Sequence, residues 1–323
     1  MRLVTFFPAG SETTTIGALS SDGSLIVDLR RASIDLQEKE GKGQSPTAMP
    51  DDMIEFLRQG APAIKSAERA LSHGLEAAVA TAAAGDVRIC SPLPRPNSIR
   101  DFMLVEEHVR GSFKEVPAEW YEIPVYWKVN ADTVFGPEDP IRWPCYTQKL
   151  DFELELAAVI GRTVDAVSVE EAQECIAGYT IFNDWSARDI QMRELKVGLG
   201  PGLGKDFATS IGPCLATPDE LDPISTRMVA RINGEVWSDG TLGAMRFSFP
   251  EVIAHLSAEQ ILQPGDVIAS GTIARGCGLE LDRWLQVGDV VELEVDGIGI
   301  LRNTITAPEP NRRKNVRDAT VQA

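Results

Sequence analysis

The sequence has few of the side chains that bind soft metal ions or build disulfide frameworks. It contains only three histidines and five cysteines, and the cysteines are widely scattered without any C-x-x-C pair. Zinc sites and disulfide frameworks need clustered Cys and His, so this spacing argues against both. It favours reduced thiols in a cytoplasmic protein.

Positive charge is also scarce. The chain has 31 Lys and Arg residues against 48 Asp and Glu residues, which gives a formal net charge of −17 at pH 7. Nucleic acids and anionic lipids are bound through clustered cations, so a surface this acidic predicts neither partner. No apolar stretch reaches the roughly 18 residues that a membrane helix needs. The N-terminus lacks a continuous apolar stretch before a small-residue cleavage site, so we predict no signal peptide.

The pattern of apolar residues divides the chain at a proline-rich stretch and predicts a β-rich α+β protein. Residues 1–30 alternate like short strands between turns. Residues 31–89 carry apolar residues at helical spacing, with the longest such run at 63–84. The stretch CSPLPRPNSIRD, which begins at Cys90, is typical of a linker, and strand-like runs dominate after it. We predict three segments: a small α/β N-terminal domain at 1–90, a β-rich domain at 91–309 and a polar tail at 310–323.

One strand-like segment carries acids where burial is expected. In LDFELELAAVIG, residues 150–161, a period of two places Asp151, Glu153 and Glu155 on one face, next to an apolar run. Three acids on one strand face repel one another. They either form a solvated edge that discourages aggregation, or they belong to a site that needs several carboxylates.

Two further acids favour the second alternative. Asp184 ends the apolar segment GYTIFND, and Asp101 follows the proline-rich linker. Carboxylates that gather in the interior need a counter-charge, because burying a lone carboxylate is very costly. A hard divalent cation supplies that charge. All-oxygen ligation without Cys or paired His suits Mg²⁺, Mn²⁺ or Ca²⁺ and argues against zinc.

Five ordered blocks give the chain a resemblance to a known family. The segments LDFELELAAVIG, FNDWSARDIQ, GPGLGKDF, ASGTI and GDVVELEVDGIGILRN lie within about residues 95–306 and together resemble the fumarylacetoacetate hydrolase superfamily. The resemblance implies a C-terminal mixed β-roll, preceded by the small N-terminal domain of the longer members. It also implies a divalent-metal enzyme that acts on β-diketo or oxo acids as a homodimer. The apolar, aromatic segment at 120–127 offers a surface for that dimer.

The same resemblance assigns site residues, position by position. The expected metal ligands are Asp101, Glu153, Glu155 and Asp184. The positions that match substrate contacts are Tyr126, Arg188, Gln191 and Thr272. Lys205 matches a lysine whose ammonium faces an enolate or carboxylate near the metal. Asp151 matches no ligand position and is left out.

His108 is the expected general base. It lies seven residues after Asp101, at the family's position for a water-activating histidine, and Glu280 matches the acid that holds its other ring nitrogen. A histidine oriented by an acid is a sound base near neutral pH. Taken alone, His108 would more often be structural, and Arg188 alone would more often form a surface salt bridge. Their places in the family blocks favour the functional interpretation.

Other positions limit the substrate and the type of site. Met103 stands where the hydrolases proper have tyrosine, and Tyr126 or Trp127 replaces their second substrate tyrosine, which argues against fumarylacetoacetate itself. The glycine-rich segment GLGPGLGKD differs from a nucleotide phosphate loop. Such a loop needs glycine at Leu199 and Ser or Thr at Asp206.

The resemblance thus implies a metal-dependent hydrolase that cleaves a C–C bond in a β-diketo acid through a metal-bound enolate. His108 would activate water, while Lys205 and Gln191 would stabilise the oxyanion. Two alternatives remain open. Without a working water base, the same site gives an oxo-acid decarboxylase or an enol–keto isomerase of the 2-hydroxyhepta-2,4-diene-1,7-dioate isomerase type. A carboxylate cluster that only holds structural Ca²⁺ would instead give a non-catalytic scaffold.

Overall fold

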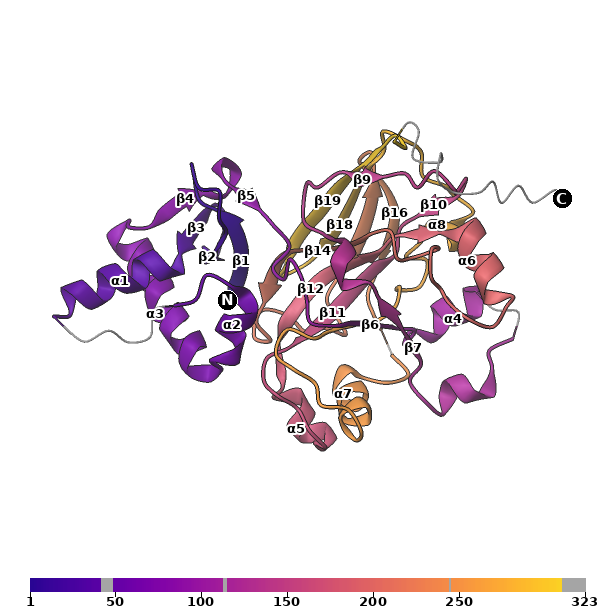
Figure 1. The fold of residues 1–323 in the computed structure, drawn as a ribbon, viewed down its shortest axis with the longest axis horizontal. Helices are drawn as coiled ribbons and strands as arrows, with labels where there is room; N and C mark the ends of the chain where they lie inside the picture. The colour runs from indigo at the N-terminus through magenta and orange to yellow at the C-terminus, as the bar shows by residue number, and fades with distance from the viewer. Residues whose placement is uncertain (42–48, 113–114, 244, 310–323) are drawn as a thin grey trace.

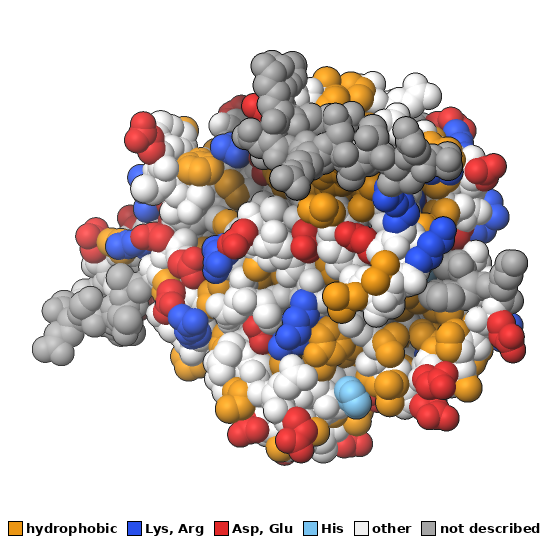
Figure 2. All heavy atoms as spheres, turned by 45° about the vertical axis from the view of Figure 1, so that its right-hand side comes forward, with side chains coloured by type: hydrophobic (Ala, Val, Ile, Leu, Met, Phe, Trp, Pro, Cys, Tyr) orange, Lys and Arg blue, Asp and Glu red, His pale blue; other side chains and the backbone are white. Residues whose placement is uncertain are grey.

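The structure is a computed structural model, and it describes residues 1–41, 49–112, 115–243 and 245–309. The predicted polar tail at 310–323 lies outside the described residues. Within those residues, no helix is long and apolar enough to cross a membrane. On the face drawn in Figure 2, Lys and Arg side chains are interspersed with Asp and Glu.

A twelve-stranded sheet runs through both halves of the chain (Figure 1). In spatial order its main strands are β4 (Thr81–Ala83), β3 (Leu25–Asp28), β2 (Thr15–Leu19), β1 (Arg2–Phe7), β14 (Thr209–Ala216), β12 (Ile176–Asp184), β11 (Leu154–Ile160), β17 (Val267–Ala269), β6 (Ile99–Phe102) and β7 (Tyr126–Val129). Beside this path, β5 (Arg88–Ile89) pairs with β1 and β8 (Val134–Phe135) pairs with β14. Because β1 pairs with β14, the sheet is continuous across the proposed domain boundary at residue 90, and that boundary stays a prediction.

Two smaller sheets complete the β structure. A five-stranded sheet has the order β16 (Glu235–Gly240), β15 (Met228–Ile232), β18 (Val290–Val295), β19 (Gly299–Thr306) and β9 (Ile141–Arg142). A two-stranded ribbon pairs β10 (Leu150–Asp151) with β13 (Ser186–Ala187). The large and five-stranded sheets share one apolar core, to which β11 contributes Leu156 and β18 contributes Leu293.

Strand β11 is buried on both faces. Leu156 and Ala158 face the core shared with the five-stranded sheet, whereas Ala157 and Val159 join the core that contains the N-terminal helices. Burial on both faces explains why the strand is a continuous apolar run. By alternation, Glu155 shares its face with Ala157 and Val159, away from the five-stranded sheet.

The N-terminal helices pack on the first strands of the large sheet (Figure 1). They are α1 (Leu29–Lys39), α2 (Met53–Arg58) and α3 (Ala61–Ala77), followed by the 3₁₀ turn η1 (Ala84–Asp86). The predicted helical run at 63–84 is wrong at its C-terminal end. Helix α3 stops before Ala78, which has a positive φ of 52°, and residues 81–83 form β4 instead. Pairing with β3 gives the backbone N–H and C=O groups of this alanine-rich segment their hydrogen-bond partners.

Short helices lie at the ends of the C-terminal strands. They are α4 (Glu106–Ser112), η2 (Ala118–Tyr121), η3 (Ala131–Thr133), α5 (Val169–Gln173), α6 (Arg188–Leu195), α7 (Phe249–Ser257) and α8 (Gly278–Leu281). Ser168 and Ser248 cap α5 and α7 with complete capping boxes. In Figure 1, α4, α6 and α8 gather on the side of the molecule away from the N-terminal helices. Each carries a predicted site residue. The predicted β-rich α+β class is confirmed.

The predicted homodimer stays a prediction. In the segment proposed for it, Trp120 is buried and its Nε1 donates a hydrogen bond to the Met103 carbonyl at 2.7 Å, so only part of 120–127 is exposed. A more exposed apolar group lies after α6, where Val197 and Leu199 are 82% and 81% exposed.

Candidate active site

Four buried carboxylates meet at one point. Asp101, Glu153, Glu155 and Asp184 each offer an oxygen within 4.8 Å of the others, and none of the four residues is more than 5% exposed. The antiparallel pairing of β11 with β12 brings the glutamates beside Asp184, and the parallel pairing of β17 with β6 adds Asp101. The structure therefore brings together the four side chains predicted as ligands. The alternative of a solvated strand edge is wrong.

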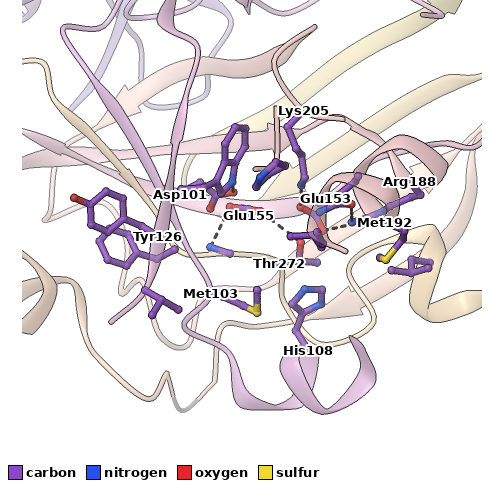
Figure 3. A pocket seen from close by; sticks show the side chains of 18 residues that line it. Asp101, Met103, His108, Tyr126, Glu153, Glu155, Arg188, Met192, Lys205 and Thr272 are labelled. Carbon is purple, nitrogen blue, oxygen red and sulfur yellow. Dashed lines mark hydrogen bonds and ion pairs between the residues drawn. The ribbon is translucent and has the colours of Figure 1, made fainter. Parts of the chain in front are cut away.

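One lysine reaches into this cluster. Nζ of Lys205 donates to Oε2 of Glu153 at 2.6 Å and also contacts Oδ2 of Asp184, as Figure 3 shows from close by. Burial disfavours the ammonium form, but Asp184 and Glu153 outweigh burial and raise the pKa of Lys205 above its ordinary value. The residue therefore stays a cation at neutral pH.

The carboxylates themselves are unevenly stabilised. Burial, helped by neighbouring acids, raises the pKa of Glu155 and Asp184 well above their ordinary values. Burial also acts on Glu153, but the charges of Arg188 and Lys205 outweigh it and hold the pKa of Glu153 below its ordinary range. Ionising Glu155 and Asp184 is therefore unfavourable unless a further positive charge lies beside them.

The donor set fits a hard divalent ion. Among the described residues, no hydrogen-bond donor reaches the buried Oδ1 atoms of Asp101 and Asp184. Buried oxygens without a donor are costly, and an ion that binds oxygen removes that cost. The cluster has neither sulfur nor nitrogen ligands, which matches Mg²⁺ or Mn²⁺ better than zinc.

Arg188, at the start of α6, bridges the cluster to a residue that sequence reasoning left out. Its Nη2 donates to Oε1 of Glu153 at 2.7 Å, and its Nε donates to Oδ2 of Asp151 at 2.8 Å. Its Nη1 donates to the side-chain oxygen of Gln191 at 3.1 Å. Asp151 is fully buried. Its place on the same strand face as the two glutamates was the signal that could have found it.

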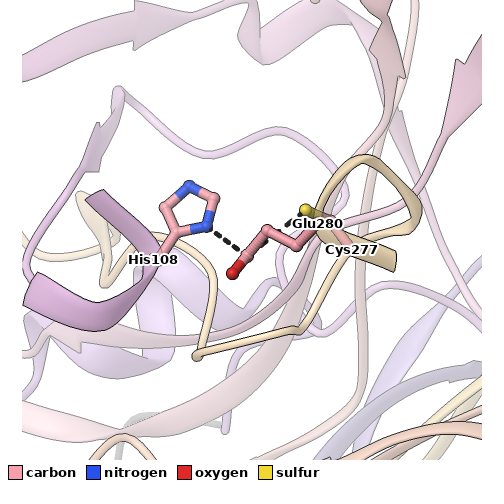
Figure 4. A group of neighbouring side chains, drawn as sticks. All are labelled: His108, Cys277 and Glu280. Carbon is pink, nitrogen blue, oxygen red and sulfur yellow. Dashed lines mark hydrogen bonds and ion pairs between the residues drawn. The ribbon is translucent and has the colours of Figure 1, made fainter. Parts of the chain in front are cut away.

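His108 and Glu280 form a pair at the edge of the site (Figure 4). Nδ1 of His108 lies 2.6 Å from Oε1 of Glu280, and both side chains are less than a tenth exposed. Glu280 also accepts hydrogen bonds from the Arg275 backbone at 3.0 Å and from the Cys277 thiol at 3.5 Å. Glu280 is therefore held in place. Because it contacts Nδ1 of His108, Nε2 of the same ring can bind another partner.

A cavity of about 270 Å³ is lined by His108 of the pair and by Asp101, Glu153 and Glu155 of the cluster (Figure 3). Among the residues predicted as substrate contacts, Tyr126, Arg188, Gln191 and Thr272 all line it. Oγ1 of Thr272 lies 3.4 Å from Oε1 of Glu155. Trp127 also lines the cavity and donates to Oδ2 of Asp101 at 2.9 Å, so it supports the cluster directly.

Known proteins share this sequence pattern. The model of the fumarylacetoacetate (FAA) hydrolase C-terminal family matches residues 98–306. The mitochondrial oxaloacetate tautomerase FAHD2A of Homo sapiens is 33% identical over 311 residues, which cover 94% of this chain and 91% of that protein. Oxaloacetate tautomerase YisK of Bacillus subtilis is 32% identical over 294 residues, which cover 87% and 95%.

Solved structures share the fold over nearly the whole chain. Fumarylacetoacetate hydrolase from Exiguobacterium antarcticum has a TM-score of 0.72 and 27% identity, and covers 95% of this chain and 99% of its own. A probable 2-hydroxyhepta-2,4-diene-1,7-dioate isomerase from Mycobacterium abscessus has a TM-score of 0.70 and 25% identity, with 96% and 100% covered. By name, one of these neighbours is a hydrolase and the other a probable isomerase.

Proposed function

We propose that this chain, which belongs to the fumarylacetoacetate hydrolase family, catalyses keto–enol tautomerisation of a small 2-oxo acid of the oxaloacetate type. Relatives that are 32–33% identical over most of the chain are named oxaloacetate tautomerases. Their names support the isomerase alternative over the C–C hydrolase that the sequence resemblance first implied. The observation that carries the proposal is one cavity that is lined both by the histidine of a proton-transfer pair and by acids of a carboxylate cluster.

The cluster would hold Mg²⁺ or Mn²⁺ through its four carboxylates, Asp101, Glu153, Glu155 and Asp184. When bound, the ion supplies Lewis-acid stabilisation of negative charge on the substrate's 2-oxo oxygen. Lys205 contributes a fixed positive charge beside the same position, because its ammonium is already desolvated among the acids. The negative charge that develops on the substrate oxygen during enolisation would therefore be stabilised by positive groups that are already in position.

His108 is the proposed general base and acid for the proton at C3 of the substrate. With Nδ1–H donating to Glu280, Nε2 is the basic nitrogen and accepts a proton from C3 of the keto acid. The enolate oxygen takes up a proton from solvent to complete the enol, and the imidazolium releases its proton. In the reverse direction the enol loses its O–H proton, and the imidazolium donates a proton to C3. Glu280 fixes the tautomer and stabilises the imidazolium that forms. The carbon chain stays intact throughout.

The remaining lining residues suit a small, polar acid. Tyr126, Gln191 and Thr272 line the cavity with polar side chains, and side chains of this kind bind and orient carboxylates. Met103 and Met192 add apolar surface to the lining. A small oxo acid would therefore be oriented by its polar end.

C–C hydrolysis is the second candidate, because the same pair could activate water. The two functions differ in their products. The purified protein should be given oxaloacetate and a series of acylpyruvates, with Mg²⁺ and with Mn²⁺. Tautomerisation predicts rapid equilibration of the enol without release of pyruvate. Stoichiometric pyruvate release from an acylpyruvate would establish hydrolysis instead, and no turnover of any of these acids would favour a scaffold.

A further inference from the structure

We infer that Asp151 is a positioning residue that ties the carboxylate cluster and the His108–Glu280 pair into one unit. The inference uses the proposed function only for its kinetic readout. Its structural basis is a fully buried carboxylate that lies outside the cavity lining but contacts elements on both sides of it.

The carboxylate of Asp151 accepts four hydrogen bonds. Its Oδ1 accepts from the backbone N–H of Phe152 at 2.9 Å and of Gly278 at 2.7 Å. Its Oδ2 accepts from the backbone N–H of Leu279 at 3.0 Å and from Nε of Arg188 at 2.8 Å. All four partners are N–H donors, and both carboxyl oxygens of Asp151 act as acceptors in these bonds.

The first connection runs to the histidine pair. Gly278 and Leu279 are the first two residues of α8, and Glu280 is the third. A Cβ on Gly278 would come within 2.6 Å of Oδ1 of Asp151, so the close approach depends on glycine at this position. Asp151 therefore fixes the turn of chain that presents Glu280 to His108.

The second connection runs to the cluster. Arg188 is 3% exposed, and its charge is shared between Asp151 and Glu153. Without Asp151, Nε of Arg188 would be free to bond Glu153 together with Nη2. That change would hold the Glu153 oxygens more tightly and turn them away from an incoming ion. Asp151 thus leaves Glu153 available to the other ligands.

The strand itself does not need this side chain. Backbone pairing of Asp151 with Ser186 in the β10–β13 ribbon holds the chain in register independently of the carboxylate. Three of the four hydrogen bonds therefore act on Arg188 and α8, and only the bond from Phe152 is local to the segment. An effect on the site without a general loss of structure follows from this arrangement.

The test is Asp151→Asn. This change keeps the size of the side chain but replaces one acceptor oxygen by an NH₂ group, which cannot accept a hydrogen bond from the N–H partners of Asp151. Mn²⁺ binding to the substrate-free protein is measured from the electron paramagnetic resonance signal of free Mn²⁺. We expect the Kd for Mn²⁺ to rise about 10-fold or more, as for other residues that orient metal ligands. In oxaloacetate tautomerisation, we expect kcat to fall about 10- to 100-fold with KM little changed.

Asp266→Asn is the matched control. Asp266 is also a buried aspartate beside an arginine, with Oδ2 lying 3.7 Å from Nη1 of Arg100 and Oδ1 accepting from Ser98 at 2.8 Å. It touches neither the cluster nor the pair, so its variant should keep the wild-type Kd and kcat. Should D151N fail to fold, Asp151→Glu keeps the charge, displaces the carboxylate by one methylene and is expected to weaken Mn²⁺ binding.

The outcomes separate the positioning role of Asp151 from the proposed tautomerase function. Wild-type Mn²⁺ affinity and kcat in D151N, or in D151E if that variant is needed, would overturn the inference. Equal losses in the Asp151 and Asp266 variants would overturn it too, because they would reflect a general structural effect. Weakened Mn²⁺ binding in D151N alone supports it, even if the wild-type protein shows no tautomerase activity and the proposed function fails.

Discussion

Nζ of Lys205 lies 2.6 Å from Oε2 of Glu153, inside a group of four buried carboxylates. Besides this ammonium, Arg188 contacts Glu153, but burial and the neighbouring acids still raise the pKa of Glu155 and Asp184 well above their ordinary values. The site is therefore arranged for a further positive charge.

The first prediction concerns metal removal. Adding Mg²⁺ or Mn²⁺ to metal-free protein should raise the melting temperature, because an ion that binds only the folded state stabilises it by about 2.7 kcal/mol at 100 times its Kd. Differential scanning calorimetry with and without a chelator measures the shift. An unchanged melting temperature at millimolar Mg²⁺ and Mn²⁺ would argue that the cluster binds neither ion.

The second prediction concerns the ligands. Glu153→Ala should lower kcat about 100-fold or more, because it removes one of the oxygens expected to hold the ion. Glu294→Ala is the control, since Glu294 lies on the five-stranded sheet and pairs with Arg231 away from the cavity. Comparable activity in the two variants at saturating metal would show that Glu153 is no ligand.

The third prediction concerns the histidine pair. His108→Ala should lower tautomerisation about 10²- to 10⁴-fold, the usual contribution of a general acid–base group. Glu280→Gln keeps the shape of its side chain and should cost less. Both variants should bind Mn²⁺ like the wild type, because neither residue belongs to the carboxylate cluster. If H108A kept full activity, another group would carry the proton.

The sequence allowed these carboxylates to be predicted as one group because short blocks carry most of them. Glu153 and Glu155 lie in one block and Asp184 in the next, but their meeting depends on the antiparallel register of β11 with β12. That register is a long-range property, which local periodicity does not reveal. The family resemblance supplied it.

Asp151 shows the limit of the same reasoning. It was set aside because it matched no ligand position, yet it is fully buried and bonds to Arg188 and α8. Its partners lie far along the chain, so no local pattern identifies them. The end of α3 was missed for a related reason, because Ala80–Ala83 has helical propensity but pairs with a distant strand.

The fourth prediction concerns the N-terminal helices. Nε2 of His73 on α3 lies 2.6 Å from Oδ2 of Asp35 on α1, whereas the described cavity lining begins at Asp101. His73→Ala should therefore leave kcat within a few-fold and lower the melting temperature. A loss of activity as large as that of E153A, in a folded protein, would place part of the site in the N-terminal region.

The difference in melting temperature between the wild type and His73→Ala should also depend on pH. Hydrogen bonds from His73 and Lys39 lower the pKa of Asp35. A lowered acid pKa stabilises the folded state above the ordinary pKa of about 4, and that contribution is lost as the pH falls through the lowered value. The difference in melting temperature between wild type and H73A should thus be present near pH 5 and shrink at lower pH. A difference that grew with acid would contradict the assignment.

The central claim is proton transfer at C3 of an intact oxo acid, and exchange of that hydrogen tests it most directly. Oxaloacetate in D₂O with Mg²⁺ is followed by proton nuclear magnetic resonance, with wild-type protein, with H108A and without protein. The account predicts that wild type accelerates loss of the C3 proton signal without forming pyruvate, and that H108A falls toward the uncatalysed rate. Exchange at the uncatalysed rate with active, metal-loaded wild-type protein that cleaves an acylpyruvate would contradict it.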